Sequence, residues 1–118
     1  MVNEFKKKYP LEKRKEESKK IREKYPERYP IIVTKDKGST LNNIDKSKFL
    51  GPDSLTLGQF LHIVRKKIEL NDNETLFLFI NGSILVNNSE TIGNIYNIYK
   101  DEDGFLYITY CNENVFGK

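Results

Sequence analysis

The sequence predicts a single α+β domain in which helices cover both faces of one sheet. Two apolar runs, LFLFI at 76–80 and FLYITY at 105–110, are typical of strands buried on both faces. Residues 56–68 carry apolar side chains at helical spacing and can cover one face of such a sheet. The charged, helix-forming segment 11–24 is available for the other face. With 118 residues, the chain is long enough to bury one core.

The N-terminal segment is expected to be helical. Residues 11–24 hold strong helix formers without Gly or Pro, Pro10 stands where proline is tolerated, and Pro26 ends the pattern. A shorter helical turn is expected at residues 3–8. The apolar stripe of the longer helix is thin and consists of Leu11, Ile21 and Tyr25. We therefore expect a mostly solvated helix that docks along one narrow edge.

Two strands are expected next. Residues 29–35 are rich in β-branched side chains and predict a strand. Because Pro30 has no N–H to donate, the start of this strand should lie at a sheet edge or leave one hydrogen bond unmade. A polar loop follows, and residues 47–53 predict a short strand that ends at Gly51-Pro52.

The second half of the chain gives the clearest signals. Thr56 and Gln59, three residues apart, form a capping-box pattern at the start of the helix 56–68. Asn81-Gly82 predicts a turn after the strand 76–80, with a short returning strand at 83–86. Apolar spacing predicts a second helix at 91–99, before the last strand at 105–110. The helix at 56–68 buries the side chains of Leu57, Phe60, Leu61, Val64 and Ile68 in this scheme.

Charge is distributed unevenly. Residues 1–28 carry eleven Lys/Arg and six Glu, a net charge of +5, whereas the rest of the chain has nine Lys/Arg and eleven Asp/Glu, a net charge of −2. The basic residues are interleaved with glutamates and no RNA- or DNA-binding motif is present, so we expect no nucleic-acid partner. A basic segment can support binding to an anionic membrane once a lipid anchors the protein there.

Composition also limits the compartment and the chemistry. No apolar run approaches the roughly 20 residues that span a bilayer, and the N-terminus lacks the apolar stretch of a secretory signal. One cysteine fits a reducing compartment, so we expect a cytoplasmic protein. Cys111 and His62 are the only thiol–imidazole pair, too few for a metal cluster. Neither residue has a setting that indicates activation, so we expect no catalytic residue, no metal and no cofactor.

Several long segments in combination resemble the autophagy ubiquitin-like modifiers, the GABARAP-type family. They are YPLEKRKEESKKIREKYPERYPIIV, IDKSKFLGPDSLTLGQFLHIVRKKI, LFLFIN and YKDEDGFLYITYCNENVFG. The resemblance implies a ubiquitin-like β-grasp roll with an N-terminal helical extension packed on the sheet. We divide the single domain 1–118 into a basic helical subdomain (1–27), a β-grasp core (28–110) and a flexible C-terminal tail (111–118).

The resemblance also implies a use for the C-terminus. By position, a cysteine protease removes Lys118, with Phe116 gripped by the protease groove, and exposes the carboxylate of Gly117. Activating-like and conjugating-like enzymes then attach Gly117 to phosphatidylethanolamine. A glycine suits this step, because without a Cβ its carbonyl can enter a narrow enzyme cleft. The implied location is cytoplasmic and, after lipidation, peripheral on autophagosomal membranes, and the implied state in solution is a monomer.

A second implied function is the capture of cargo receptors with aromatic-x-x-aliphatic motifs, which add as a strand beside residues 47–52. The implied aromatic pocket is lined by Glu17, Ile21, Pro30, Ile32, Lys48, Leu50 and Phe105. The implied aliphatic pocket is lined by Phe49, Pro52, Leu55, Phe60 and Ile63, with Val64 nearby. Lys46, Lys48 and Arg28 would meet acidic residues that flank the motif.

The chain departs from the family at several positions. Gly51 replaces a usual valine, so the aliphatic pocket is expected to lose a wall. Residues 83–93 replace a stretch rich in proline and alanine, and Asn112 and Val115 replace a common glycine and threonine before the tail. An alternative function remains open: a ubiquitin-like interaction module that shares the fold and groove but is not conjugated.

Overall fold

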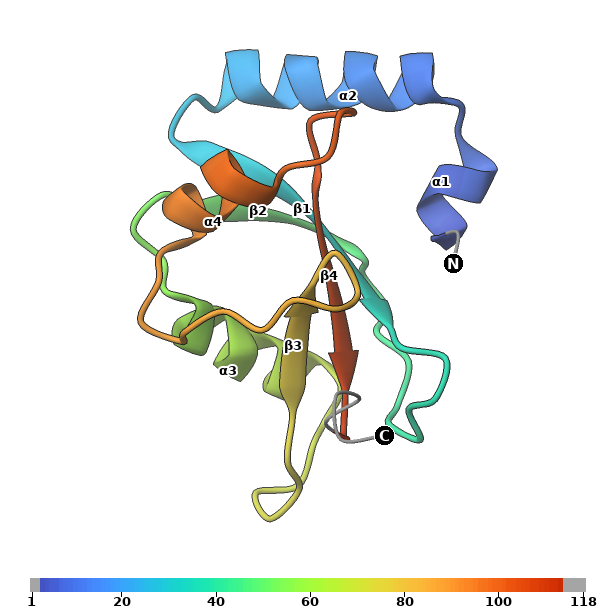
Figure 1. Cartoon of the computed structure of the whole chain (residues 1–118), viewed down its shortest axis with the longest axis vertical. Coiled ribbons are helices and arrows are strands. Elements are labelled where there is room, and N and C mark those ends of the chain that lie inside the picture. Colours follow the sequence, from blue (N-terminus) through green and yellow to red (C-terminus); the bar gives the residue numbers. More distant parts are fainter. Residues whose placement is uncertain (1–2, 114–118) are drawn as a thin grey trace.

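A four-stranded mixed sheet of order β2-β1-β4-β3 forms the centre of the molecule (Figure 1). The computed structural model describes residues 3–113. β1 pairs antiparallel with β2 and parallel with β4, and β4 pairs antiparallel with β3. The predicted α+β class is confirmed. In chain order the elements are α1 (Glu4–Lys8), α2 (Leu11–Lys24), β1 (Arg28–Lys35), β2 (Lys48–Pro52), α3 (Leu57–Lys67), β3 (Phe77–Ile80), α4 (Ile92–Tyr99) and β4 (Leu106–Cys111).

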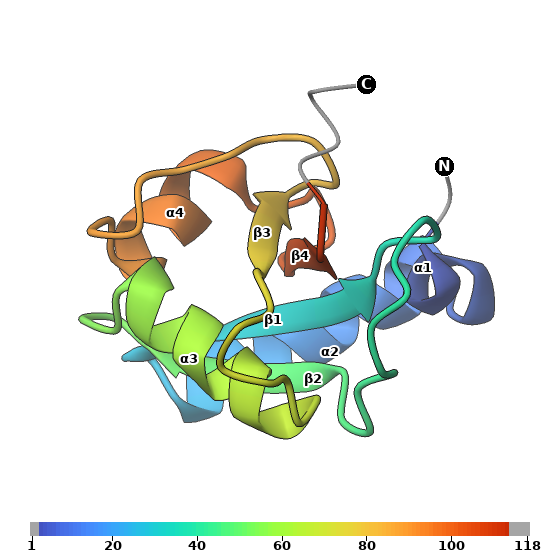
Figure 2. The ribbon, with the colours of Figure 1, turned by 90° about the horizontal axis from the view of Figure 1, so that it is seen from below.

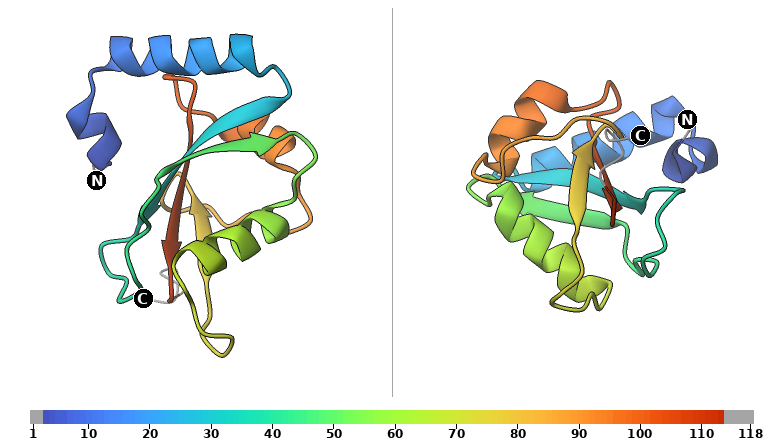
Figure 3. Two further views of the ribbon diagram at one scale, coloured as in Figure 1. Left: turned by 180° about the vertical axis from the view of Figure 1, so that it is seen from behind. Right: turned by 60° about the horizontal axis from the view of Figure 1, so that its bottom comes forward.

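Helices lie on both sides of the sheet, as predicted from the two apolar runs at 76–80 and 105–110. Figures 2 and 3 show α3 and α4 on one side and α1 and α2 on the other. Side chains of β1 alternate between these sides: Ile31 and Val33 join the large core under α3 and α4, whereas Ile32 joins a smaller cluster under α1 and α2. The sheet therefore separates two apolar clusters of unequal size.

Local capping fixes where the helices begin. Thr56 forms the predicted capping box: its hydroxyl accepts from the Gln59 amide, and the Gln59 side chain accepts from the Thr56 amide. The side chains of Asn3 and Thr91 accept from backbone amides at the starts of α1 and α4. These caps satisfy donors that a helix start leaves unpaired.

Pro30 has no backbone N–H, and it lies at a position of β1 where no hydrogen bond to a neighbouring strand requires one. The parallel ladder with β4 begins at Ile31, one residue later. Pro30 pairs with Leu50 of β2 at a position where the backbone N–H would point away from β2. The start of β1 thus has no pairing partner on the β4 side. Of the two outcomes expected for Pro30, a sheet edge or an unmade hydrogen bond, the first is found.

The predicted returning strand at 83–86 is wrong. Asn81 and Gly82 both have positive φ, at 53° and 78°, and form the expected turn, but only one bridge follows, between Ile80 and Ile84. The chain then leaves the sheet, because the carbonyls of Asn88 and Glu90 accept from amides in the first turn of α3. β4 also runs one residue further than predicted and includes Cys111, which is buried.

The α2 helix docks mainly through polar side chains. Its half-buried or buried positions recur at helical spacing, but Tyr25, expected on the apolar stripe, is 38% exposed. Arg22 instead lies over the Tyr29 ring, 4.3 Å from its centroid, and donates to the carbonyls of Pro26 and Arg28. The docking positions of α2 are Leu11, Arg14, Glu17, Ser18, Ile21 and Arg22.

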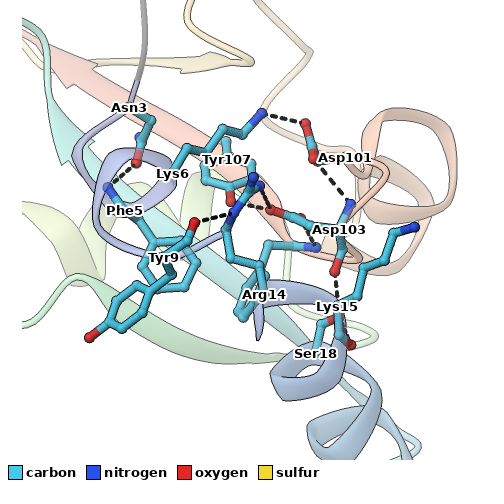
Figure 4. A network of polar contacts seen from close by, with 11 residues as sticks. Asn3, Phe5, Lys6, Tyr9, Arg14, Lys15, Ser18, Asp101, Asp103 and Tyr107 are labelled. Atoms are coloured by element: carbon cyan, nitrogen blue, oxygen red, sulfur yellow. Dashed lines mark hydrogen bonds and ion pairs between the residues drawn. The ribbon is translucent and has the colours of Figure 1, made fainter. Parts of the chain in front are cut away.

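Asp103, in the loop between α4 and β4, is the polar centre of this docking (Figure 4). Its carboxylate is fully buried and accepts from Arg14 of α2 at 2.6 Å, from the Tyr107 hydroxyl and from the Phe105 amide. The Asp103 carbonyl accepts from the Ser18 hydroxyl. Burial raises the pKa of the Tyr107 phenol, the Asp103 carboxylate raises it further and Arg14 opposes the rise, so Tyr107 remains a protonated donor at neutral pH.

Asp103→Ala should lower the free energy of unfolding by about 3–5 kcal/mol, because it leaves the nearly buried Arg14 guanidinium without its carboxylate. Urea unfolding followed by circular dichroism measures this change. Glu102→Ala, at the exposed neighbouring position, is the control and should stay within about 0.5 kcal/mol of the unmodified protein. A loss below about 1 kcal/mol for Asp103→Ala would contradict a central role for this carboxylate.

Candidate functional site

Among residues 3–113, β2 forms one edge of the sheet, and no described strand pairs with its outer side. The amide of Asp53 donates to Glu27, and that of Val33 donates to Ser47, so hydrogen-bonded pairs between β1 and β2 fall at every second residue. By this alternation, the N–H and C=O groups of Lys48 and Leu50 point away from β1, toward the outer edge. Pro52 has no N–H and ends this row of donors. The edge can accept one further strand over a short stretch.

On the α2 side of this edge, the residues of the implied aromatic pocket lie together. Ile32 and Phe105 belong to one buried cluster, against which Ile21 packs. Lys48 pairs across the sheet with Ile32, and Leu50 pairs with Pro30. Exposure is uneven within this set: Leu50 is 37% exposed, whereas Ile32 and Phe105 are at most 1% exposed.

On the opposite side of β2, three residues of the implied aliphatic pocket also gather. The Phe49 ring meets the Phe60 ring edge-on at a centroid distance of 5.5 Å, and Leu55 packs against the same core. Ile63, three residues after Phe60 on α3, is 36% exposed beside this group. Pro52 is separate from it: it pairs with Arg28 and, by strand alternation, belongs to the α2 side.

Cationic side chains border the same edge. The Lys48 ammonium forms a 2.6 Å ion pair with Glu17 of α2, and the Lys46 ammonium lies 5.5 Å from the centroid of the Phe49 ring. Arg28 is exposed at the other end of the strand pair. A negatively charged ligand beside β2 would therefore meet positive charge along its length.

Gly51 does not leave a gap. It is buried on the core side of β2, and a Cβ at this position would come within 2.8 Å of Ile31 Cδ1 and 3.1 Å of Ile92 Cγ2. These two isoleucines already occupy the space that a larger side chain would need. The expectation that Gly51 removes a wall of the pocket did not consider that Ile31 and Ile92 occupy this space from the core side.

The other residues singled out in the sequence lie apart from this edge. His62 is exposed on α3, whereas the buried Cys111 thiol lies 3.9 Å from side-chain oxygens of Asp36 and Asn112. Phe116, Gly117 and Lys118, the predicted processing site, lie outside the described residues, as does most of the predicted tail 111–118. Within residues 3–113, no helix is long and apolar enough to cross a membrane.

Comparison with known proteins identifies the family to which this chain belongs. The model of the family described as "Autophagy protein Atg8 ubiquitin like" matches residues 13–117, almost the whole chain. The chain belongs to the Atg8 family. It is an autophagy ubiquitin-like modifier, and interactions with a conjugation pathway and with receptors are properties of that family in general.

Individual relatives agree with this membership. Autophagy-related protein 8e of Arabidopsis thaliana is 50% identical over 91% of this chain and 87% of its own length. Autophagy-related protein 8 of Gibberella zeae is 45% identical over 100% of this chain and 99% of its own. The crystal structure of Trypanosoma brucei ATG8 superposes with a TM-score of 0.89 at 38% identity, covering 96% of this chain and 97% of that one. The predicted ubiquitin-like fold is thus confirmed.

Two aromatic residues beside the edge were not anticipated as part of the site. Phe5 of α1 is buried against Phe105, and Tyr9 packs on the same cluster. The signal available in the sequence was their spacing: residues four apart meet on one side of a short helix. Which surface they would meet depends on how α1 folds back, which spacing does not reveal.

Gly51→Val should lower the free energy of unfolding by about 1–3 kcal/mol, because the added methyl groups overfill the space held by Ile31 and Ile92. Ile31→Val removes Cδ1, the nearest atom, and alone should cost about 0.5–1.5 kcal/mol. In a double-mutant cycle measured by urea unfolding, the double variant should lose less than the two single variants together. Additive losses would show that Ile31 is not what excludes a side chain at position 51.

Proposed function

We propose that this modifier captures receptors and adaptors through a groove along β2, by adding an aromatic-x-x-aliphatic segment as a fifth strand. The observation that carries the proposal is the free edge of β2, with outward backbone groups at Lys48 and Leu50 and apolar side chains on both sides. The proposed groove consists of Glu17, Ile21, Arg28, Pro30, Ile32, Lys46, Lys48, Phe49, Leu50, Pro52, Leu55, Phe60, Ile63 and Phe105.

Side-chain exposure favours this surface. Leu50 and Ile63 are two of five large apolar side chains that are at least 36% exposed in the part of the chain described. Leu50 lies on β2 itself, and Ile63 lies on α3. Exposed apolar groups near a free strand edge are typical of peptide recognition by strand addition. The cations Lys46, Lys48 and Arg28 favour partners with acidic residues next to the motif.

The second part of the proposal concerns the C-terminus. A cysteine protease cleaves after Gly117 and releases Lys118, and activating-like and conjugating-like enzymes join Gly117 to phosphatidylethanolamine. The protein is then cytoplasmic before lipidation and peripheral on autophagosomal membranes after it. Family membership and the match that extends to residue 117 support this assignment.

The modifier itself is proposed to be non-catalytic. The buried Cys111 and the exposed His62 lie on different elements, β4 and α3, and the contacts of the thiol are to oxygens of Asp36 and Asn112. Catalytic cysteines are commonly activated by a neighbouring histidine, and the contacts of the Cys111 thiol do not include His62. A non-conjugated interaction module is the second candidate function, because the groove is the same whether or not Gly117 is used.

Phe49→Ala combined with Leu50→Ala should reduce binding of an acidic peptide with an aromatic-x-x-aliphatic core by at least about tenfold, because both sides of β2 lose apolar contacts. Isothermal titration calorimetry measures the affinity, and circular dichroism checks the fold. The control is Leu85→Ala, another exposed apolar position away from β2, which should bind normally. Unchanged affinity in the double variant would move the binding site away from this edge.

Intact-mass measurement on the protein from its own cells tests the C-terminal assignment. The soluble pool should lack the mass of Lys118, and the membrane pool should carry phosphatidylethanolamine. Gly117→Ala should block both changes while leaving peptide binding intact, since Gly117 is not one of the proposed groove residues. Full-length, unmodified protein in both pools would favour the non-conjugated module instead.

A further inference from the structure

A pocket of about 560 Å³ lies on the side of the sheet that carries α1 and α2, next to the smaller apolar cluster. Ile32 and Tyr107 belong to that cluster, and Thr34 and Thr109 lie two residues further along the same strands. Because side chains alternate along a strand, the two threonines point to the same side as Ile32 and Tyr107. This face of the sheet therefore becomes polar where the apolar cluster ends, and the pocket opens there.

The pocket contains a buried hydroxyl that the described residues leave unsatisfied. Thr34 and Thr109 are direct partners in the parallel pairing of β1 with β4, and both line the pocket. The hydroxyl of Thr34 accepts a 3.4 Å contact from the Asn3 amide group. The Thr109 hydroxyl is buried, yet it has no hydrogen-bond partner among residues 3–113. Buried polar atoms are nearly always paired, so a bound molecule in the pocket can supply the missing partner.

Charges of both signs surround this hydroxyl. The pocket is lined by three cations and three carboxylates, which belong to Lys6, Lys35, Lys37, Glu4, Asp36 and Asp101. Lys6 and Asp101 neutralise each other in an ion pair at 2.6 Å (Figure 4). Among the described residues, neither Lys37 nor Asp36 forms an ion pair. Balanced charges of both signs suit a ligand that carries a positive and a negative group better than a simple anion.

The pocket also lies beside the point where the chain leaves β4. The Cys111 thiol is 3.9 Å from a carboxylate oxygen of Asp36, and the Asn112 amide group donates to the Thr40 hydroxyl. Gly117, the proposed conjugation site, follows Asn112 by five residues, which can span at most about 18 Å. A membrane that holds the protein through Gly117 therefore lies within reach of this pocket.

We propose that the pocket binds the headgroup of an unconjugated ethanolamine phospholipid in that membrane. The phosphate meets Lys37 and the hydroxyls of Thr34 and Thr109, and the primary ammonium, with its three N–H donors, meets Asp36. The inference rests on the proposed attachment to phosphatidylethanolamine. It adds a second, non-covalent contact with the same class of lipid, which turns this face of the protein toward the bilayer.

Titration of the unmodified full chain with glycerophosphoethanolamine tests the site without a membrane. The backbone amide NMR signals of Thr34, Gly82 and Thr109, which line the pocket, should shift and saturate. Glycerophosphocholine has the same phosphodiester, but its methylated ammonium has no N–H to donate to Asp36, so it should bind about tenfold more weakly. Inorganic phosphate should shift these signals least. Equal responses to all three probes would show a general anion site and overturn the proposal.

Two variants separate recognition of the ammonium from a structural effect. Asp36→Asn should abolish the tenfold preference and leave binding of glycerophosphocholine unchanged, since its amide oxygen can still accept from the Gly38 amide. If Asp36 were merely structural, both probes would bind more weakly. Thr109→Val keeps the shape but removes the hydroxyl, and should weaken both probes about fivefold. The matched controls Asp72→Asn and Thr75→Val change exposed residues that do not line the pocket, and should bind both probes normally.

Vesicles distinguish a lipid headgroup from a soluble ligand. With vesicles of equal parts phosphatidylcholine and phosphatidylethanolamine, the NMR signals of the pocket should lose intensity, whereas phosphatidylcholine vesicles should leave them unchanged. Binding of glycerophosphoethanolamine without this effect would indicate a soluble ligand and overturn the membrane assignment. Absence of shifts with glycerophosphoethanolamine would overturn the inference altogether. Because the titration uses unmodified protein, neither result depends on whether Gly117 is conjugated, which the intact-mass measurement tests separately.

Discussion

The buried carboxylate of Asp103 links two parts of the chain that the sheet alone would not hold together. It lies in the loop before β4 and accepts hydrogen bonds from Arg14 on α2 and from Tyr107 on β4. A buried charge is tolerated only when its partners satisfy it, so the loop, the helix and the strand must meet in one arrangement. That arrangement sets the height and direction of α2 over the sheet.

The position of α2 in turn shapes the candidate groove. With α2 fixed, Glu17 and Ile21 stand beside β2, and the cluster of Ile32 and Phe105 is enclosed between sheet and helices. The docking uses polar contacts, which are directional, in place of a broad apolar stripe. The charge-assisted bond between Arg14 and Asp103 adds geometric specificity to this docking.

Two consequences of sheet geometry complete the surface. The antiparallel pairing of β1 with β2 turns the backbone groups of Lys48 and Leu50 outward, and the alternation of side chains divides the edge into two sides of different character. The proposed conjugation site, Gly117, comes after β4 in the chain, and β4 is a central strand of the sheet. The two proposed functions, receptor binding and membrane attachment, therefore use different residues of one small domain.

The sequence by itself determined most of the secondary structure and indicated the family. Strong local signals, such as the capping box at Thr56, the turn at Asn81-Gly82 and the apolar runs of β3 and β4, depend on neighbours within a few residues and were interpreted correctly. The short strand expected at 83–86 does not form. The chain that follows it makes hydrogen bonds to the first turn of α3, which is distant in sequence.

Only the tertiary structure decided how Asp103, Gly51 and Phe5 are used. In the sequence, Asp103 is one acidic residue of a charged turn, and its burial depends on Arg14, 89 positions away. Gly51 suggested a missing wall until Ile31 and Ile92 were found in its place. Phe5 suggested a minor helical turn, yet its ring lies against Phe105, one hundred positions along the chain. Each role rests on a long-range contact, and residue spacing carries no information about which distant surface a side chain will meet.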